Sequence, residues 1–251
     1  MPTVGELSAP YENFMLAPRP GQGVCRECFN LTDGYDRCYA CAQHPSVLEA
    51  VVPVSYSVAH EQLHHVLANY KRLTGEVARR LTLQLAAVLW RFLELHERCA
   101  AHAAGADRFL VVTTVPSSDQ MRDEPHPLRW IVSDLVGPTR GRYERLLRRS
   151  IAEVAPRSFN PEKYVAQRRL HGDPVLLIDD TWTTGANAQS AAAALKSAGA
   201  GPLAAVVIGR HVNRKWHEND GKLRALAKPF DWRRCALCSG LGAVRPEATA
   251  A

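Results

Sequence analysis

Two adjacent aspartates, Asp179 and Asp180, follow a run of apolar residues in the segment VLLIDDTWTTGAN, which covers residues 175–187. The apolar run predicts a buried strand, and the alanine-rich residues after it predict a helix that begins directly beyond the turn. A helix N-terminus offers free backbone N–H groups to an anion, threonine hydroxyls add donors, and Gly185 lets the backbone approach a ligand closely. We therefore expect the turn of residues 181–185 to hold a phosphate.

The two carboxylates would repel that phosphate unless another group lies between them. A sugar ring satisfies this requirement, because its hydroxyls donate to the acids while its phosphate occupies the turn. A divalent cation between the acids and the phosphate is the other solution. A simple cap accounts for a lone pair of aspartates, but it does not account for the whole pattern. No G-x-x-x-x-G-K-[ST] segment and no G-x-G-x-x-G segment after a strand occurs, which excludes the commonest nucleotide-binding loops.

Four cysteines near the N-terminus form the pattern C-x2-C-x9-C-x2-C, which is typical of a tetrahedral zinc site. They are Cys25, Cys28, Cys38 and Cys41. Four thiolates leave no open coordination position, so we expect structural Zn²⁺; a redox or metal-free role is the alternative, and His44 is a substitute ligand to consider.

A second C-x2-C pair, Cys235 and Cys238, lies near the C-terminus. It could join the first pattern, bind its own metal with a histidine, or form a redox-sensitive pair, and we favour a position near the first pattern. Cys99 is interpreted as an ordinary core residue.

The remaining pattern predicts strands alternating with helices, which favours an α/β fold with a mostly parallel twisted sheet flanked by helices. Strands are expected at 47–58, 108–116, 174–180 and 203–210, with an edge strand at 163–170; helices are expected at 59–70, 76–103, 127–136 and 186–198. The long helix carries an apolar stripe formed by Val77, Leu81, Leu85, Val88, Phe92, Leu95 and Cys99. Residues 146–154 are ambiguous, and 155–162 form a loop.

The domain division follows from these elements: an irregular arm (1–23), a zinc-knuckle module (24–46), an α/β domain (47–215), and a C-terminal extension with the second C-x2-C pair and a disordered tail (216–251).

The net charge of +6 suits a phosphate-rich ligand or a nucleic acid. A local group of arginines is interpreted as a solvated amphipathic face; it comprises Arg140, Arg142, Arg145, Arg148 and Arg149. No secretory signal and no membrane-spanning run is visible, so we expect a cytoplasmic protein. In that compartment, cysteines are expected as metal ligands or free thiols rather than as a disulfide set.

The segment VLLIDDTWTTGAN resembles the phosphoribosyl-pyrophosphate (PRPP) motif of type I phosphoribosyltransferases. This resemblance implies that Asp179 and Asp180 contact the ribose hydroxyls, and that the 5′-phosphate lies against Thr181, Trp182, Thr183, Thr184 and Gly185. Together with the zinc knuckle and the segment NYKRLTG at 69–75, it resembles the ComF family, which is related to competence and DNA uptake in some bacteria. The segment VVTTVPSS is similar to that family's pyrophosphate loop, which implies a role for Thr114, Val115, Pro116 and Ser117, with Lys71 and Arg122 as candidate cations.

The resemblance implies a Mg²⁺-dependent phosphoribosyltransferase that binds PRPP, transfers the phosphoribosyl group and releases pyrophosphate. A non-catalytic PRPP-binding or DNA-associated accessory protein is the second hypothesis, and a structural or redox module is the third. The segment after Pro116 matches the family pattern poorly, so the sequence does not identify the acceptor. The oligomeric state, a homodimer included, also stays open.

Overall fold

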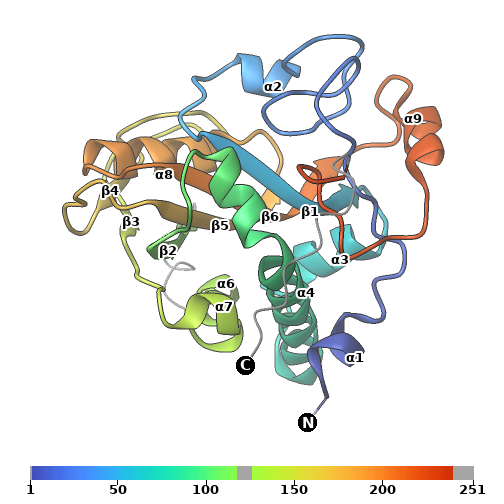
Figure 1. Ribbon diagram of the computed structural model, residues 1–251, viewed down its shortest axis with the longest axis horizontal. Helices are drawn as coiled ribbons and strands as arrows, with labels where there is room; N and C mark the ends of the chain where they lie inside the picture. The colour runs from blue at the N-terminus through green and yellow to red at the C-terminus, as the bar shows by residue number, and fades with distance from the viewer. Residues whose placement is uncertain (1, 118–125, 240–251) are drawn as a thin grey trace.

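The computed structural model of the protein describes residues 2–117 and 126–239 (Figure 1). Its helices are α1 (Val4–Ser8), α2 (Tyr39–Ala42), α3 (Gln62–Asn69), α4 (Gly75–Ala103), α6 (Pro127–Trp130), the π-helical turn η1 (Ile131–Leu135), α7 (Gly137–Arg140), α8 (Ala186–Ser197) and α9 (Asn219–Leu226). Its strands are β1 (Ala50–Val58), β2 (Val111–Thr114), β3 (Leu147–Arg149), β4 (Tyr164–Ala166), β5 (Val175–Trp182) and β6 (Leu203–Val212).

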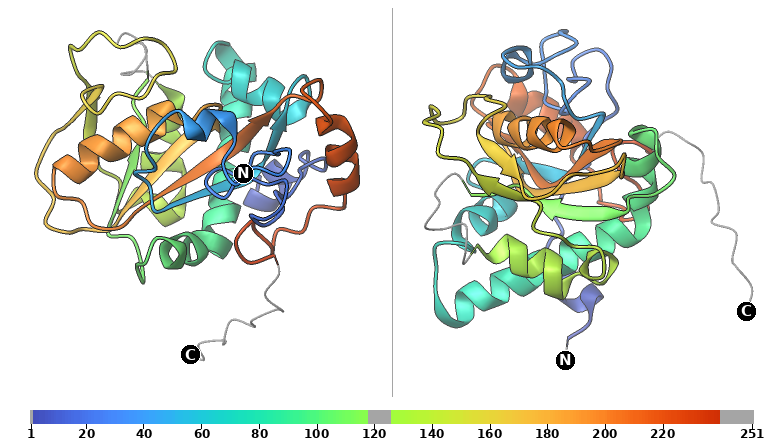
Figure 2. Two further views of the ribbon diagram at one scale, coloured as in Figure 1. Left: turned by 90° about the horizontal axis from the view of Figure 1, so that it is seen from above. Right: turned by 90° about the vertical axis from the view of Figure 1, so that its left-hand side faces the viewer.

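A four-stranded, all-parallel sheet in the order β1-β6-β5-β2 forms the centre of the molecule. Leu176 and Leu177 of β5, which point to opposite faces of the sheet, are both fully buried, as the continuous apolar run predicts. Helices α3 and α4 and the α6–η1–α7 segment lie on one face. Helix α8 and the cysteine module lie on the other (Figure 2). The expected α/β class with a parallel sheet flanked by helices is confirmed.

The sequence located every strand of this sheet, with differences at the ends. Strand β5 continues to Trp182, so the aspartate pair lies within the strand rather than at its end. The expected edge strand at 163–170 is β4, which pairs antiparallel with β3 in a separate two-stranded sheet. The expected helix at 127–136 divides into α6 and the π-helical turn η1.

The buried face of α4 differs from the predicted stripe. Val77 is 48% exposed and Leu95 is 46% exposed, whereas His96 is only 3% exposed. One helical turn after Phe92 falls between residues 95 and 96, and the pattern of apolar types selected the leucine. The structure instead buries the histidine against the core, beside Cys99.

Within the described residues, no helix combines the length and apolar character that crossing a membrane requires.

The N-terminal arm that the sequence predicts as irregular includes α1, whose Thr3 and Glu6 form a reciprocal capping box.

Candidate functional site

A cleft of about 390 Å³ opens beside the end of β5 and the first turn of α8. The cleft is lined by Arg149, Val154, Pro156, Arg157, Lys163, Asp179, Thr181, Trp182, Thr183, Thr184, Gly185, Asn187 and Ala188. The structure therefore brings one of the two predicted acids and the whole predicted phosphate turn to a single cavity.

The two aspartates point to opposite faces of the sheet, because successive side chains of a strand alternate. Asp179 lies on the α8 side and lines the cleft. Asp180 lies on the α3 side, is 6% exposed, and accepts hydrogen bonds from the Tyr70 hydroxyl at 2.8 Å and the Lys71 ammonium at 2.7 Å. Lys71, which the sequence offered as a pyrophosphate contact, is thus the counter-ion of Asp180.

These surroundings give the two carboxyl groups different protonation behaviour. Burial, and next the charge of Asp180, raise the pKa of Asp179 to about 8. Burial also acts to raise the pKa of Asp180, but the Lys71 charge and the hydrogen bonds from Lys71 and Tyr70 outweigh it and hold that pKa below its ordinary value. Asp180 is therefore a paired carboxylate, whereas Asp179 is a carboxyl group that still lacks a cationic partner at this distance among the described residues.

The turn after β5 has the backbone that anion binding requires. Gly185 has φ of 84°, in the left-handed region, and precedes α8 as its N-cap. The Thr184 hydroxyl accepts from the Ala186 N–H at 3.3 Å, and Thr183 is exposed toward the cleft. The first-turn N–H groups of a twelve-residue helix then lie beside the cavity.

Trp182 has a different role from the threonines around it. Its side chain is 1% exposed, and its ring lies so close under Gly185 that a Cβ at that position would come within 2.2 Å of the ring. The ring forms part of the cleft wall and leaves the cavity open. Its contribution to a phosphate site is therefore the shape of the turn.

Three basic side chains line the cleft, and the sequence did not single them out for this role. Lys163 is 2% exposed, and its ammonium donates to Asn187 Oδ1 at 2.6 Å. Burial, followed by the charge of Arg149, lowers the pKa of Lys163. Arg149 and Arg157 are the other two basic residues of the lining. In the sequence, Lys163 and Tyr164 were visible only as the first residues of the expected edge strand, which does not indicate a role in the cleft.

The arginine group interpreted as one solvated amphipathic face does not share a face in the structure. Arg140 ends α7, Arg149 ends β3 at the cleft, and Arg142 is held by Glu97 at 2.7 Å and by the Phe109 carbonyl at 2.8 Å. Its members instead belong to separate elements.

The predicted pyrophosphate loop lies next to the aspartates. Thr114 is paired with Ile178 across β2 and β5, and the Val115 N–H donates to the Ile178 carbonyl at 3.1 Å. The Pro116 carbonyl accepts from the Tyr164 hydroxyl at 3.3 Å, and Ser117 follows. Arg122, the other candidate cation, lies outside the described residues.

The cysteine module holds its four sulfur atoms together, with all four within 4.8 Å of one another and each side chain at most 5% exposed. Convergent buried thiols of this kind fit tetrahedral Zn²⁺. The donor set is complete without His44, whose Nε2 is 3.0 Å from the Thr184 carbonyl oxygen. The predicted Cys25, Cys28, Cys38 and Cys41 set is therefore a confirmed cluster that could hold zinc.

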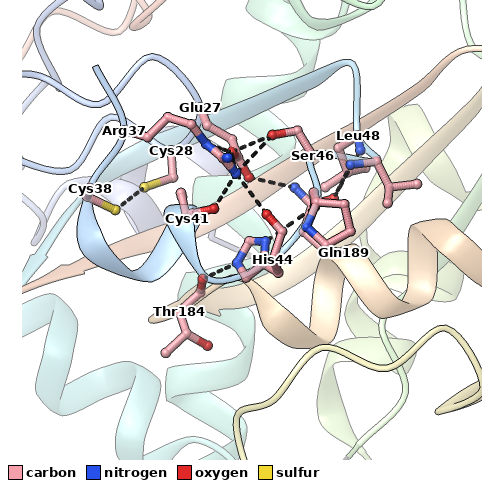
Figure 3. Close-up of polar contacts among 12 residues, drawn as sticks. Glu27, Cys28, Arg37, Cys38, Cys41, His44, Ser46, Leu48, Thr184 and Gln189 are labelled. Carbon is pink, nitrogen blue, oxygen red and sulfur yellow. Dashed lines mark hydrogen bonds and ion pairs between the residues drawn. The ribbon is translucent and has the colours of Figure 1, made fainter. Parts of the chain in front are cut away.

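This module contacts the phosphate turn and α8 directly (Figure 3). Besides the His44 contact, Gln189 Oε1 accepts from the Val47 and Leu48 N–H groups at 2.8 and 3.0 Å. The Gln189 Nε2 donates to Glu27 at 2.8 Å, and Glu27 also binds Arg37 at 2.8 Å. The first turns of α8 are thus fixed to the cysteine module through a fully buried amide.

Arg210 of β6 makes a second connection on the same side. It is 2% exposed and donates to the carbonyl oxygens of Cys28 and Trp182, each at 3.2 Å. Burial opposes its charge, but the negative charge of Cys28 and Cys38 nevertheless raises the pKa of Arg210. A cation is therefore buried between the thiol cluster and the last residue of β5.

The second C-x2-C pair does not add ligands to the first cluster. The sulfur atoms of Cys235 and Cys238 lie with His96 and Cys99 in a separate group. Ala236, between the two cysteines, packs in the apolar cluster that contains Phe29 of the cysteine module, so the two modules are neighbours. The interpretation of Cys99 as an ordinary core residue is corrected, because its sulfur belongs to this group.

No protein-family model matches the chain, and no match was found among the curated proteins or among the solved structures.

Proposed function

We propose that the protein binds PRPP in the cleft beside β5 and α8, and transfers the phosphoribosyl group to an acceptor with release of pyrophosphate. The observation that carries this proposal is the composition of the cleft. A carboxyl group, an N–H-rich turn before a helix and three basic side chains line one cavity. This set is complementary to a molecule that has hydroxyls next to phosphates.

Each part of PRPP has a corresponding part of the cleft in this proposal. The turn of residues 181–185 accepts the 5′-phosphate through backbone N–H and threonine hydroxyl groups. Asp179 accepts hydrogen bonds from the ribose hydroxyls. Arg149 and Lys163 also line the cleft, and we assign these two cations to the negative charge of the pyrophosphate.

The two aspartates receive different roles. Asp180 reaches a sugar only if its bond to Lys71 opens, so we assign it to positioning: it fixes the end of α3 against β5. Asp179 faces the cavity, and in its ionised form it stabilises the positive charge that develops on the ring when the bond from C1 to pyrophosphate breaks. The pair therefore divides between one group at the substrate and one group behind it.

A divalent cation is expected to arrive with the substrate. Mg²⁺ usually keeps several waters and uses one or two carboxylates together with substrate phosphates, which agrees with a single carboxyl group at the cleft. It would neutralise the charge of the leaving pyrophosphate. Zn²⁺ in the tetrathiolate cluster has no open position and would serve structure.

Calorimetry of PRPP with MgCl₂, followed by assays of pyrophosphate release with nucleobases and amines, tests the proposal. We expect binding by the wild type and a loss of at least about tenfold in affinity, or about 1.4 kcal/mol, for Asp179→Ala. Asp107→Asn, at an exposed position outside the cleft, is the matched control. Absence of PRPP binding would refute the proposal. Binding without turnover of any acceptor would favour the non-catalytic PRPP-binding protein instead.

A further inference from the structure

A second group of metal-ligating side chains lies away from the cleft and joins two distant parts of the chain. His96 and Cys99 come from α4, and Cys235 and Cys238 come from the segment after α9. One ligand atom from each of the four lies within 4.8 Å of all the others. The group is separate from the tetrathiolate cluster and from the cleft lining.

The spacing of these atoms is that of a tetrahedral site. Zn–S bonds of about 2.3 Å and Zn–N bonds of about 2.0–2.1 Å place neighbouring ligand atoms about 3.5–3.8 Å apart. The Cys235 and Cys238 sulfurs are 3.4 Å apart. His96 Nδ1 is 3.8 Å from the Cys99 sulfur and 3.8 Å from the Cys238 sulfur.

The imidazole of His96 is oriented as a metal-ligating histidine requires. Its Nε2 is 2.8 Å from the Trp232 carbonyl oxygen, so the proton belongs on Nε2, where it donates to that carbonyl. The lone pair of Nδ1 then points toward the three sulfurs. The histidine is 3% exposed and lies within the apolar face of α4, so the carbonyl alone fixes its tautomer.

The local sequence explains how the ligands converge. His96 and Cys99 are three residues apart on a helix and share a face. Cys235 and Cys238 enclose a turn in which the Ser239 N–H donates to the Cys235 carbonyl at 3.0 Å. The Cys235 N–H donates to the Cys238 sulfur at 3.2 Å.

We propose that His96, Cys99, Cys235 and Cys238 bind a second structural Zn²⁺. Four ligands leave no open coordination position, so the ion stabilises the fold without taking part in chemistry. It attaches the C-terminal segment to α4, where Trp232 already stacks with Arg91 at 4.5 Å and contacts Phe14 of the N-terminal arm. A simple redox pair would need neither His96 nor Cys99. The proposal does not depend on what the cleft binds.

Zinc content of the full-length protein, purified under reducing conditions from zinc-supplemented cells, is the first test. We expect two zinc ions per chain in the wild type and one in the double variant Cys235→Ser/Cys238→Ser, as measured by mass spectrometry of the metal. His102→Ala is the matched control, because this exposed histidine of the same helix should leave both ions bound. One zinc per chain in the wild type overturns the proposal, whatever the variants do.

Cobalt substitution identifies the ligands even if the serine variant folds poorly. His96→Cys should keep two metal ions and shift the visible bands of the second Co²⁺ toward those of a tetrathiolate site, whereas His96→Ala should release that ion. Unchanged bands in His96→Cys refute the assigned ligand. A disulfide between Cys235 and Cys238 in the wild type, detected as the loss of two hydrogens in intact mass, would establish the redox pair instead.

Discussion

The ammonium of Lys71 lies 2.7 Å from Asp180 Oδ2, and this bond links the residues that follow α3 to β5, on the face of the sheet opposite to Asp179. The carboxylate side chain is 9% exposed and the lysine side chain 35% exposed, so the pair is buried on one side and open to solvent on the other. The Tyr70 hydroxyl donates to the same oxygen at 2.8 Å. Among the described residues, Lys71 is therefore the cation that forms an ion pair with Asp180, and the charge of His126 adds to its effect on the pKa of Asp180.

Removing that cation alone should cost more than removing the pair. Lys71→Met leaves a buried carboxylate without a counter-ion, and we expect a loss of about 1–3 kcal/mol, reduced from the full cost of a broken buried pair because the lysine is partly exposed. The double variant Lys71→Met/Asp180→Asn removes the charge and should recover most of this loss. Urea unfolding of the wild type, both single variants and the double variant gives the coupling energy; additive effects would contradict the pairing.

The raised pKa of Asp179 predicts a pH-dependent stability. The folded protein holds the proton with a pKa of about 8, whereas an unfolded chain titrates near about 3.9. The stabilisation from this proton is complete below about pH 4 and is lost as the pH rises through about 8. Asn is neutral at every pH, so Asp179→Asn should gain stability relative to the wild type as the pH increases, by at most about 5–6 kcal/mol over this window. Unfolding midpoints of both proteins at about pH 5, 7 and 9 measure this change in relative stability. If the difference in stability between the two proteins does not change with pH, the pKa of Asp179 is not raised.

The sequence identified the strands, the long helices and the cysteine cluster because their signals are local. Continuous apolar runs indicate buried strands, and the spacing of Cys25, Cys28, Cys38 and Cys41 indicates a ligand set without knowledge of the fold. The turn of residues 181–185, to which we assign a phosphate, was equally readable as a turn between β5 and α8 because these residues are contiguous.

The remaining site residues were not readable because distance along the chain separates them. Lys163 reaches the cleft only because β4 packs near α8, and Lys71 meets Asp180 only through the packing of α3 against the sheet. The opposite directions of Asp179 and Asp180 follow from strand alternation, but only once β5 is known to continue past them to Trp182. His96 was missed because an apolar neighbour, Leu95, satisfied the helical pattern equally well.

Two constraints act on Gly185, a left-handed backbone and a close aromatic ring, whereas only the first acts on Gly172. The Gly185 φ of 84° is strained for any side chain, and a Cβ would meet the Trp182 ring at 2.2 Å. Gly172 has nearly the same φ, 83°, with nothing within 4 Å of a Cβ. Gly172→Ala should therefore cost about 1 kcal/mol from backbone strain alone, and Gly185→Ala about 2–4 kcal/mol because the ring must also move. Denaturant unfolding measures both, and equal costs would show that the ring yields freely.

Gln189 should be the residue through which the cysteine module supports α8. Its fully buried amide serves Val47 N–H, Leu48 N–H and Glu27 together. Gln189→Leu keeps the volume but leaves two buried N–H groups and one carboxylate oxygen without this partner, so we expect a loss of about 2–4 kcal/mol in urea unfolding. Gln43→Leu, at an exposed position in the same module, is the control and should change stability by less than about 0.5 kcal/mol. If Gln189→Leu also speeds zinc loss to a chelator while Gln43→Leu does not, the helix and the module unfold as one unit; unchanged release, with stability near that of the control, would show that the amide network contributes little.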